Sequence, residues 1–206
     1  MAKGSGKNNW LTRQQKDPYV KQAQQSLYRS RAVFKLIEID DRDHLFQQGH
    51  IVIDLGAAPG SWSQYVSEKI GHQGRLIAVD ILPMEPITNT LFIKGDFIEQ
   101  PIYEACLQAM NHGKADLVIS DMSPNLSGIR ATDQARSLNL AELAYDLAKS
   151  VLKQGGDMLV KLFEGEGTDM YRYNLKEHFG KIIVRKPKAS RDDSREFYVL
   201  ARTFRL

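Results

Sequence analysis

The chain has 206 residues and a mass of 23.4 kDa, which suits one domain with a substantial hydrophobic core. Hydrophobic residues make up 42% of it and charged residues 26%, and these ordinary values exclude a disordered, collagen-like or coiled-coil protein. No stretch reaches the roughly 18 apolar residues of a membrane span or resembles a signal peptide, so we expect a cytoplasmic protein without membrane contacts. The lone cysteine, Cys106, excludes an intramolecular disulfide and a cysteine-rich zinc site, and the five histidines lack metal-ligand spacing. We therefore expect no metal.

The basic side chains gather at the two ends of the chain. Residues 1–35 hold eight lysines or arginines against one aspartate, and residues 181–206 hold eight against three acidic residues. If the two ends meet in space, they form one positive face suited to a phosphate backbone; the alternative is a pair of solvated tails. The polar, glutamine-rich residues 1–25 are predicted to be a flexible basic segment, and residues 26–206 a single domain.

The hydrophobic pattern predicts one helix and then an alternation of strands and helices. The first helix begins after Ser26, a possible N-cap, and ends near Gly49. Short continuous apolar runs predict strands at 51–55, 75–80, 91–94, 115–121 and 157–163. Amphipathic stretches with cap or stop signals predict helices at 61–70, 99–111, 135–153 and 168–179. A loop too short for a crossover helix joins two more runs, which are predicted to be antiparallel strands at 181–186 and 196–204.

Strands that are apolar throughout are covered on both faces, and their alternation with helices indicates parallel pairing through right-handed crossovers. The predicted fold class is therefore α/β. It is a doubly wound, seven-stranded, mostly parallel sheet with an antiparallel last strand. Ligands of such sheets bind beyond the carboxyl ends of the strands.

The residues that follow the first three strands fit an adenosine-containing cofactor. Gly56 and Gly60 lie in a turn after the first strand, where the backbone can approach a ligand closely. Asp80 ends the second strand and can accept hydrogen bonds from ribose hydroxyls, and Asp96 follows the third and can accept from an adenine amino group. The spacing of the glycines differs from the dinucleotide fingerprint, which disfavours NAD and FAD. The alternative is that the glycines form a tight turn and the aspartates cap the following segments.

Five segments together resemble the FtsJ/RrmJ family of S-adenosylmethionine-dependent RNA ribose 2′-O-methyltransferases: DLGAAPGSW at 54–62, DMSPN at 121–125, KLF at 161–163, SR at 190–191 and EFY at 196–198. The resemblance runs from about Ser26 to the C-terminus. It implies the class I methyltransferase fold and methylation of a uridine ribose in 23S ribosomal RNA of the large subunit. It also implies a catalytic tetrad, placed on Lys35, Asp121, Lys161 and Glu196. The S-adenosylmethionine site that it implies is lined by Gly60, Trp62, Asp80, Asp96 and Asp121.

Lys161 is the candidate general base of this tetrad. A ribose hydroxyl is a poor nucleophile, so the protein must align it with the methyl group and remove its proton. A lysine does this near neutral pH only when its pKa is lowered to about 7 to 8. Desolvation and the charge of Lys35 favour the neutral amine, whereas Asp121 and Glu196 favour the ammonium. The sequence leaves open which effect prevails, and the two carboxylates are expected to orient the lysines.

Basic side chains near both ends are predicted to contact RNA: Arg29, Arg31, Lys186, Lys188 and Arg191. The segment DMSP lacks the Asn/Asp-Pro-Pro-Tyr signature common in amino-group methyltransferases, so a ribose target is favoured over a base nitrogen. The expected partner is ribosomal RNA within the large subunit, and the chain is expected to be a monomer. Three other hypotheses remain: methylation of another RNA such as tRNA, a non-catalytic RNA-binding ribosome-assembly factor, and a nucleotide-dependent oxidoreductase.

Overall fold

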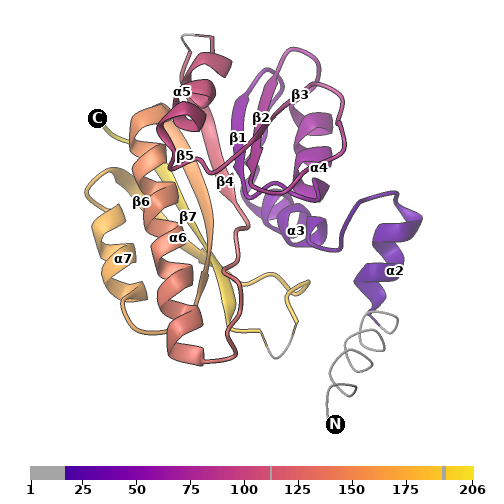
Figure 1. Cartoon of the computed structure of the whole chain (residues 1–206). Coiled ribbons are helices and arrows are strands. Elements are labelled where there is room, and N and C mark those ends of the chain that lie inside the picture. The colour runs from indigo at the N-terminus through magenta and orange to yellow at the C-terminus, as the bar shows by residue number, and fades with distance from the viewer. Residues whose placement is uncertain (1–16, 112, 192–193) are drawn as a thin grey trace.

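Figure 1 shows the computed structural model of the chain, which describes residues 17–111, 113–191 and 194–206. Most of the segment expected to be flexible, residues 1–16, lies outside the described residues. Its described part holds helix α2 (Pro18–Gln25), which is capped by Asp17: the carboxylate accepts a hydrogen bond from Tyr19 N at 3.0 Å. Among the described residues, no helix combines the length and the apolar character needed to cross a membrane.

The remaining elements follow in this order: α3 (Val33–Asp43), β1 (Ile51–Leu55), α4 (Ser61–Ile70), β2 (Arg75–Asp80), β3 (Thr90–Lys94), α5 (Gln100–Ala109), β4 (Ala115–Ser120), α6 (Arg130–Val151), β5 (Leu152–Phe163), α7 (Thr168–Leu175), β6 (Phe179–Arg185) and β7 (Glu196–Phe204). Their strands form one seven-stranded sheet in the order β3-β2-β1-β4-β5-β7-β6. Strands β1 to β5 pair in parallel, and β7 runs antiparallel to both β5 and β6. The predicted fold class and the antiparallel last strand are confirmed.

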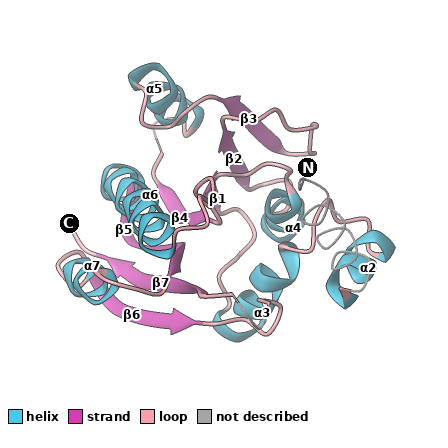
Figure 2. Ribbon diagram, turned by 60° about the horizontal axis from the view of Figure 1, so that its bottom comes forward, coloured by secondary structure: helices cyan, strands magenta, loops and turns pink. Residues whose placement is uncertain are grey.

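Helices cover both faces of the sheet (Figure 2). Helices α5, α6 and α7 lie over one face, and α3 and α4 lie over the other. The first core includes Cys106 of α5, Ala144 of α6 and Leu175 of α7, and the second includes Leu36 of α3 and Val66 of α4. The central strands are therefore buried on both faces, which explains why their sequences are apolar without alternation.

The predicted start of the first helix is wrong. Ser26 does not begin a helix but follows α2 as its C-cap. Helix α3 begins only at Val33, and the chain between the two helices contacts α4, where Gln64 Oε1 accepts a hydrogen bond from Arg29 N at 2.9 Å. There the hydroxyl of Ser30 forms a hydrogen bond with that of Ser61, 2.7 Å away. Such a partner, distant in sequence, is invisible to a local pattern.

Helix α6 and strand β5 also begin earlier than predicted. Helix α6 begins at Arg130, because Asp133 fixes the turn before it by accepting a hydrogen bond from Ser127 N at 2.7 Å. Strand β5 begins at Leu152, which pairs with Ala115 before a register shift in the β4–β5 ladder. Both differences arise from pairings that the apolar pattern does not encode.

The two basic ends of the chain meet beside α3. Arg31 Nη2 donates a hydrogen bond to Ala189 O, and the carboxylate of Glu38 accepts one from Lys188 N at 2.7 Å. The expectation that the ends come together is thus confirmed for the described residues. The start of α3 and the loop between β6 and β7 form one surface at the edge of the sheet.

Candidate active site

The four residues of the expected tetrad come together where the parallel strands end. Lys161 lies in the last part of β5, and Asp121 directly follows β4. The Lys161 Nζ lies 3.0 Å from Asp121 Oδ1 and 2.5 Å from the backbone oxygen of the same residue. Lys35, in the first turn of α3, pairs with Glu196, the first residue of β7, with 2.6 Å between Nζ and Oε1. The Lys161 side chain is only 5% exposed, and a buried ammonium requires such partners.

Asp121 carries a negative charge between the two lysines. Burial alone would raise the pKa of its carboxyl, but the ammonium groups of Lys161 and Lys35 outweigh burial. A hydrogen bond from Tyr198 acts in the same direction, so the pKa of Asp121 is held below its usual value. The carboxylate therefore remains available to hold Lys161 in place down to acidic pH.

Tyr198 belongs to this site, although the sequence pattern indicated no role for it. It stands opposite Lys161 in the β5–β7 ladder, and its hydroxyl donates to Asp121 Oδ1 at 2.7 Å. Its ring packs against Trp62 with 5.8 Å between ring centroids, and Lys35 Nζ lies 6.0 Å from its centre. Burial and the nearby carboxylate charges raise the pKa of the phenol well above its usual value, so it stays a donor. The motif EFY contained this residue, but an aromatic in a buried strand is ordinarily a core residue.

A cavity of about 370 Å³ opens beyond the ends of the four strands β1 to β4, a size typical of small-molecule sites. Four residues predicted to bind the cofactor line it: Gly56, Asp80, Asp96 and Asp121. Gly60 and Trp62 lie outside this lining. Trp62 is buried against α3, where its Nε1 donates to Ala32 O at 2.8 Å. Gly60 lies against Arg29, since a Cβ there would stand 2.7 Å from the guanidinium Nη1.

The polar groups of this cavity suit a nucleoside. Both carboxylate oxygens of Asp80 accept a backbone N–H, from Ala58 and from Leu82 at 2.8 Å each, and each keeps a lone pair for a ribose hydroxyl. Gly56 has a φ of 74°, and a Cβ there would stand 2.4 Å from Met122 Cγ, so glycine leaves room that a side chain would fill. The residues present therefore fit an adenosine-containing cofactor.

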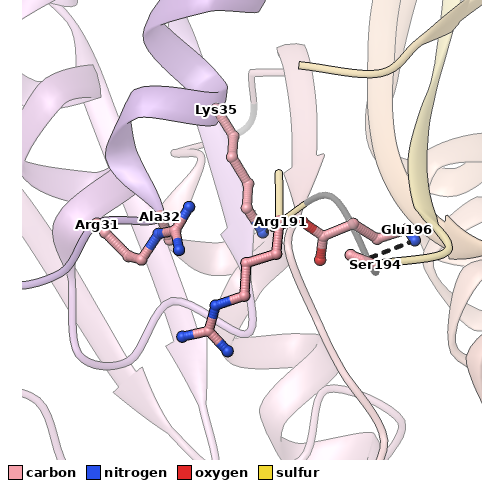
Figure 3. A pocket seen from close by; sticks show the side chains of 6 residues that line it. All are labelled: Arg31, Ala32, Lys35, Arg191, Ser194 and Glu196. Carbon is pink, nitrogen blue, oxygen red and sulfur yellow. Dashed lines mark hydrogen bonds and ion pairs between the residues drawn. The ribbon is translucent and has the colours of Figure 1, made fainter. Parts of the chain in front are cut away.

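A second cavity, of about 390 Å³, adjoins the Lys35–Glu196 pair (Figure 3). It is lined by Arg31, Ala32, Lys35, Arg191, Ser194 and Glu196. Arg31 and Ala32 line it from just before α3 and Lys35 from the first turn of α3, and the other three residues belong to the segment that leads into β7. Asp121 lines the first cavity, and Lys35 and Glu196 line the second, so the tetrad contacts both.

The model of FtsJ-like methyltransferases matches residues 28–204 of the chain, which include every element from α3 to β7. The chain belongs to the FtsJ-like methyltransferase family. It is 53% identical over 205 residues to the ribosomal RNA large subunit methyltransferase E of Pseudomonas aeruginosa, covering 100% of this chain and 99% of that protein. It is 49% identical over 206 residues to the protein of the same name from Marinobacter nauticus, covering 100% of both.

Solved structures share the fold of this methyltransferase. A crystal structure assigned as a ribosomal RNA methyltransferase from Plasmodium falciparum has a TM-score of 0.77 at 28% identity, covering 86% of this chain and 98% of that chain. Fibrillarin from Aeropyrum pernix, solved with natively bound S-adenosyl-L-methionine, has a TM-score of 0.50 at 18% identity, covering 84% of this chain and 75% of that one. At this low identity, the similarity to fibrillarin shows a shared fold and nothing more.

The predicted RNA contacts of the methyltransferase divide into two groups. Arg31 and Arg191 line the second cavity, which we call the basic cavity. The exposed Lys186 and Lys188 lie on the neighbouring loop between β6 and β7. Arg29 has a different environment, because its guanidinium already donates three hydrogen bonds of 2.8–3.0 Å to backbone oxygens of Pro59, Glu85 and Pro86. It braces two loops at the cofactor side of the sheet and keeps only part of its donors for RNA.

A further ionisable group, Asp54, lies in β1, close enough to Asp121 and Asp80 of the first cavity for their charges to act on it. Its carboxyl is buried and accepts a hydrogen bond from Ser63 Oγ at 2.6 Å. Burial, and then the charges of Asp121 and Asp80, raise its pKa to about 7 despite that hydrogen bond. The carboxyl of Asp54 therefore takes up a proton at a higher pH than an ordinary aspartate does.

Proposed function

We propose that the chain transfers a methyl group from S-adenosylmethionine to the ribose 2′-hydroxyl of a uridine in 23S ribosomal RNA of the large ribosomal subunit. The observation that carries the proposal is the tetrad, which contacts a nucleoside-sized cavity through Asp121 and a basic cavity through Lys35 and Glu196. The names of the relatives from Pseudomonas aeruginosa and Marinobacter nauticus support the large-subunit substrate.

The first cavity is the proposed cofactor site. Asp80 would hold the ribose hydroxyls, Asp96 and Phe97 would contact the adenine, and the carboxylate of Asp121 would face the positive sulfonium. S-adenosylmethionine supplies a methyl group that is already activated by its sulfonium. Gly60 and Trp62 contribute to this site indirectly, by fixing the turn and helix that follow β1.

Lys161 is the proposed general base. Its neutral amine would accept the proton of the ribose hydroxyl, a role that contributes about 10²- to 10⁴-fold to the rate in comparable cases. Asp121 fixes the position of this amine through its side chain and its backbone oxygen. The Lys35–Glu196 pair borders the basic cavity, where it would position the hydroxyl. Alignment of the two reacting groups supplies the larger share of the rate, about 7 to 11 kcal/mol in favourable cases.

The second cavity and the adjoining loop form the proposed RNA surface. Arg31 and Arg191 inside the cavity, and Lys186 and Lys188 beside it, would contact phosphates. Arg29 would also contact RNA, through the guanidinium N–H groups that do not donate to the backbone oxygens of Pro59, Glu85 and Pro86. We further propose that the protein works as a monomer in the cytoplasm and meets its RNA within the large ribosomal subunit.

The test is to offer alternative substrates to the purified protein. Methyl-labelled S-adenosylmethionine is incubated with large ribosomal subunits, with protein-free 23S RNA and with tRNA, all from cells that lack the enzyme, and the labelled nucleotide is mapped. The proposal predicts label on one uridine ribose of 23S RNA. Label confined to tRNA, or on a base, would contradict it. RNA binding without any transfer would favour the non-catalytic assembly factor.

A further inference from the structure

An acidic side chain from the N-terminal part of the chain, that of Asp17, contacts the two arginines that line the basic cavity beside Lys35. The carboxylate of Asp17 forms an ion pair with Arg31 Nη1, and the same oxygen, Oδ2, lies 3.9 Å from Arg191 Nε. The side chain of Asp17 is only 10% exposed and that of Arg31 only 15%. One carboxylate oxygen thus lies against both arginines that line the cavity.

Arg31 and Arg191 keep their positive charge inside the cavity, because no other residue of the described lining pairs with them. Lys35 is already paired with Glu196 inside the same cavity. Arg31 is also held in place, because its Nη2 donates to Ala189 O and its guanidinium lies 5.4 Å from the centre of the Tyr19 ring. A guanidinium fixed in this way is suited to bind an anion without further ordering.

Asp17 occupies this position incompletely. Arg31 Nε is buried and has no hydrogen-bond partner among the described residues. Arginine typically binds an anion through two parallel N–H···O bonds, yet only Oδ2 of Asp17 is directed at the guanidinium. The other oxygen, Oδ1, accepts the N–H of Tyr19 at the start of α2. A phosphate has several oxygens without such a commitment, so one of them can accept from Arg31 Nη1 while another accepts from Arg191.

We propose that Arg31 and Arg191 form the binding site for one backbone phosphate of the substrate RNA, and that Asp17 occupies this site in the free protein and is displaced when RNA binds. The inference rests on the proposed function in that the ligand is RNA. Because Lys35 lines the same cavity, this phosphate belongs to a nucleotide next to the reacting ribose. Asp17 then weakens the binding of any RNA that does not deliver a phosphate to this point.

The substitution Asp17→Asn removes the negative charge of this side chain without removing the cap of α2. Asparagine caps a helix as well as aspartate does, so α2 keeps its first hydrogen bond while the ion pair with Arg31 is lost. Binding of a fluorescein-labelled single-stranded RNA of mixed sequence is measured by fluorescence anisotropy with the full chain and no cofactor. We expect D17N to bind roughly three- to tenfold more tightly. The matched control is Asp41→Asn, at an exposed position of α3 without an ion pair among the described residues, and it should change the affinity by less than about twofold.

A double-mutant cycle distinguishes two causes of tighter RNA binding: the loss of the ion pair with Arg31, and the mere removal of a negative charge from the protein. In an Arg31→Gln background, Asp17→Asn should no longer tighten binding, because the guanidinium that it frees is absent. An equal gain from D41N, or a gain that persists in the R31Q background, would overturn the proposal. Weaker binding by D17N would overturn it too, since Asp17 would then order the arginines for RNA. All these outcomes concern affinity alone, so they are independent of whether methyl transfer to 23S RNA is detected.

Discussion

At the scale of single residues, the arrangement of the tetrad depends on the groups that stabilise the Asp121 carboxylate. Its carboxylate contacts the Lys161 ammonium and accepts the hydroxyl of Tyr198, and Lys35 acts on it through space. Each partner stabilises the ionised carboxylate against the cost of burial. The position of the Lys161 amine therefore depends on the other partners of Asp121 as well as on Asp121 itself.

Tyr198 is the residue whose removal tests this dependence. Tyr198→Phe keeps the packing of the ring but removes the hydroxyl that donates to Asp121 Oδ1. A hydrogen bond to a charged group contributes about 1.5 to 3 kcal/mol, so we expect kcat to fall about tenfold or more. Without this donor the ionised carboxylate is less stable and the pKa of Asp121 rises. The acidic limb of the pH–rate profile should therefore move to higher pH.

The control is Tyr171→Phe, which removes an equally buried hydroxyl from α7, where it donates to Ala141 O at 3.0 Å. Both variants should lose comparable stability in a thermal melt, but only Tyr198→Phe should shift the pH profile. If the two variants have the same kcat and the same profile, Tyr198 serves the core and not the tetrad.

At the scale of elements, the turn between β1 and α4 shapes the cofactor cavity. Gly56→Ala places a Cβ against Met122 and strains a residue whose φ is 74°. The backbone strain costs about 1 to 2 kcal/mol, and the contact narrows the cavity. We expect lower thermal stability together with at least a tenfold weaker affinity for S-adenosylmethionine in isothermal titration calorimetry.

Gly49→Ala provides the comparison, because Gly49 has a φ of 84°, but a Cβ added there would meet no atom of the described residues within 4 Å. It should lose similar stability and keep its affinity for the cofactor. Equal affinities in the two variants would show that the approach of Gly56 to Met122 does not shape the cofactor site.

The strands could be predicted from the sequence, whereas the starts of two helices and most of the site could not. The strands were predictable, because burial on both faces leaves continuous apolar runs such as residues 51–55. The starts of α3 and α6 were not, because they depend on side-chain bonds of Ser30 and Asp133 to partners that a hydrophobic pattern does not indicate. The four residues of the tetrad could be picked out only through the motifs of the family, since Glu196 alone has the features of an edge-strand charge. Tyr198 was missed for a similar reason.

At the scale of the whole molecule, the chain brings its two basic ends to one edge of the sheet. Contacts between Arg31 and Ala189 and between Glu38 and Lys188 join them beside the tetrad. A positive surface next to the tetrad is suited to attract RNA and to fix its register without reading bases. This arrangement explains why a chain of small net charge, +3, is expected to bind a polyanion.

The salt dependence of RNA binding tests whether this surface contacts phosphates. Neutralising Arg31 and Lys188 with glutamine should flatten the plot of log affinity for RNA against log salt, by about 0.7 for each phosphate that the variant no longer neutralises. Lys114→Gln with Lys153→Gln removes the same charge near the starts of β4 and β5, at the end of the parallel strands opposite to the tetrad. This control should leave the slope unchanged. An unchanged slope in the first variant would exclude Arg31 and Lys188 as phosphate contacts.

The most direct test of the whole account is the single-turnover rate of methyl transfer to large ribosomal subunits by Lys161→Met. Methionine preserves much of the volume and the apolar stem but cannot accept a proton, so the rate should fall about 10²-fold or more. The affinity for S-adenosylmethionine should stay within about threefold of the wild type, because Lys161 is not among the residues that line the cofactor cavity. A folded variant that transfers methyl groups at the normal rate would contradict the assignment of Lys161 as the base.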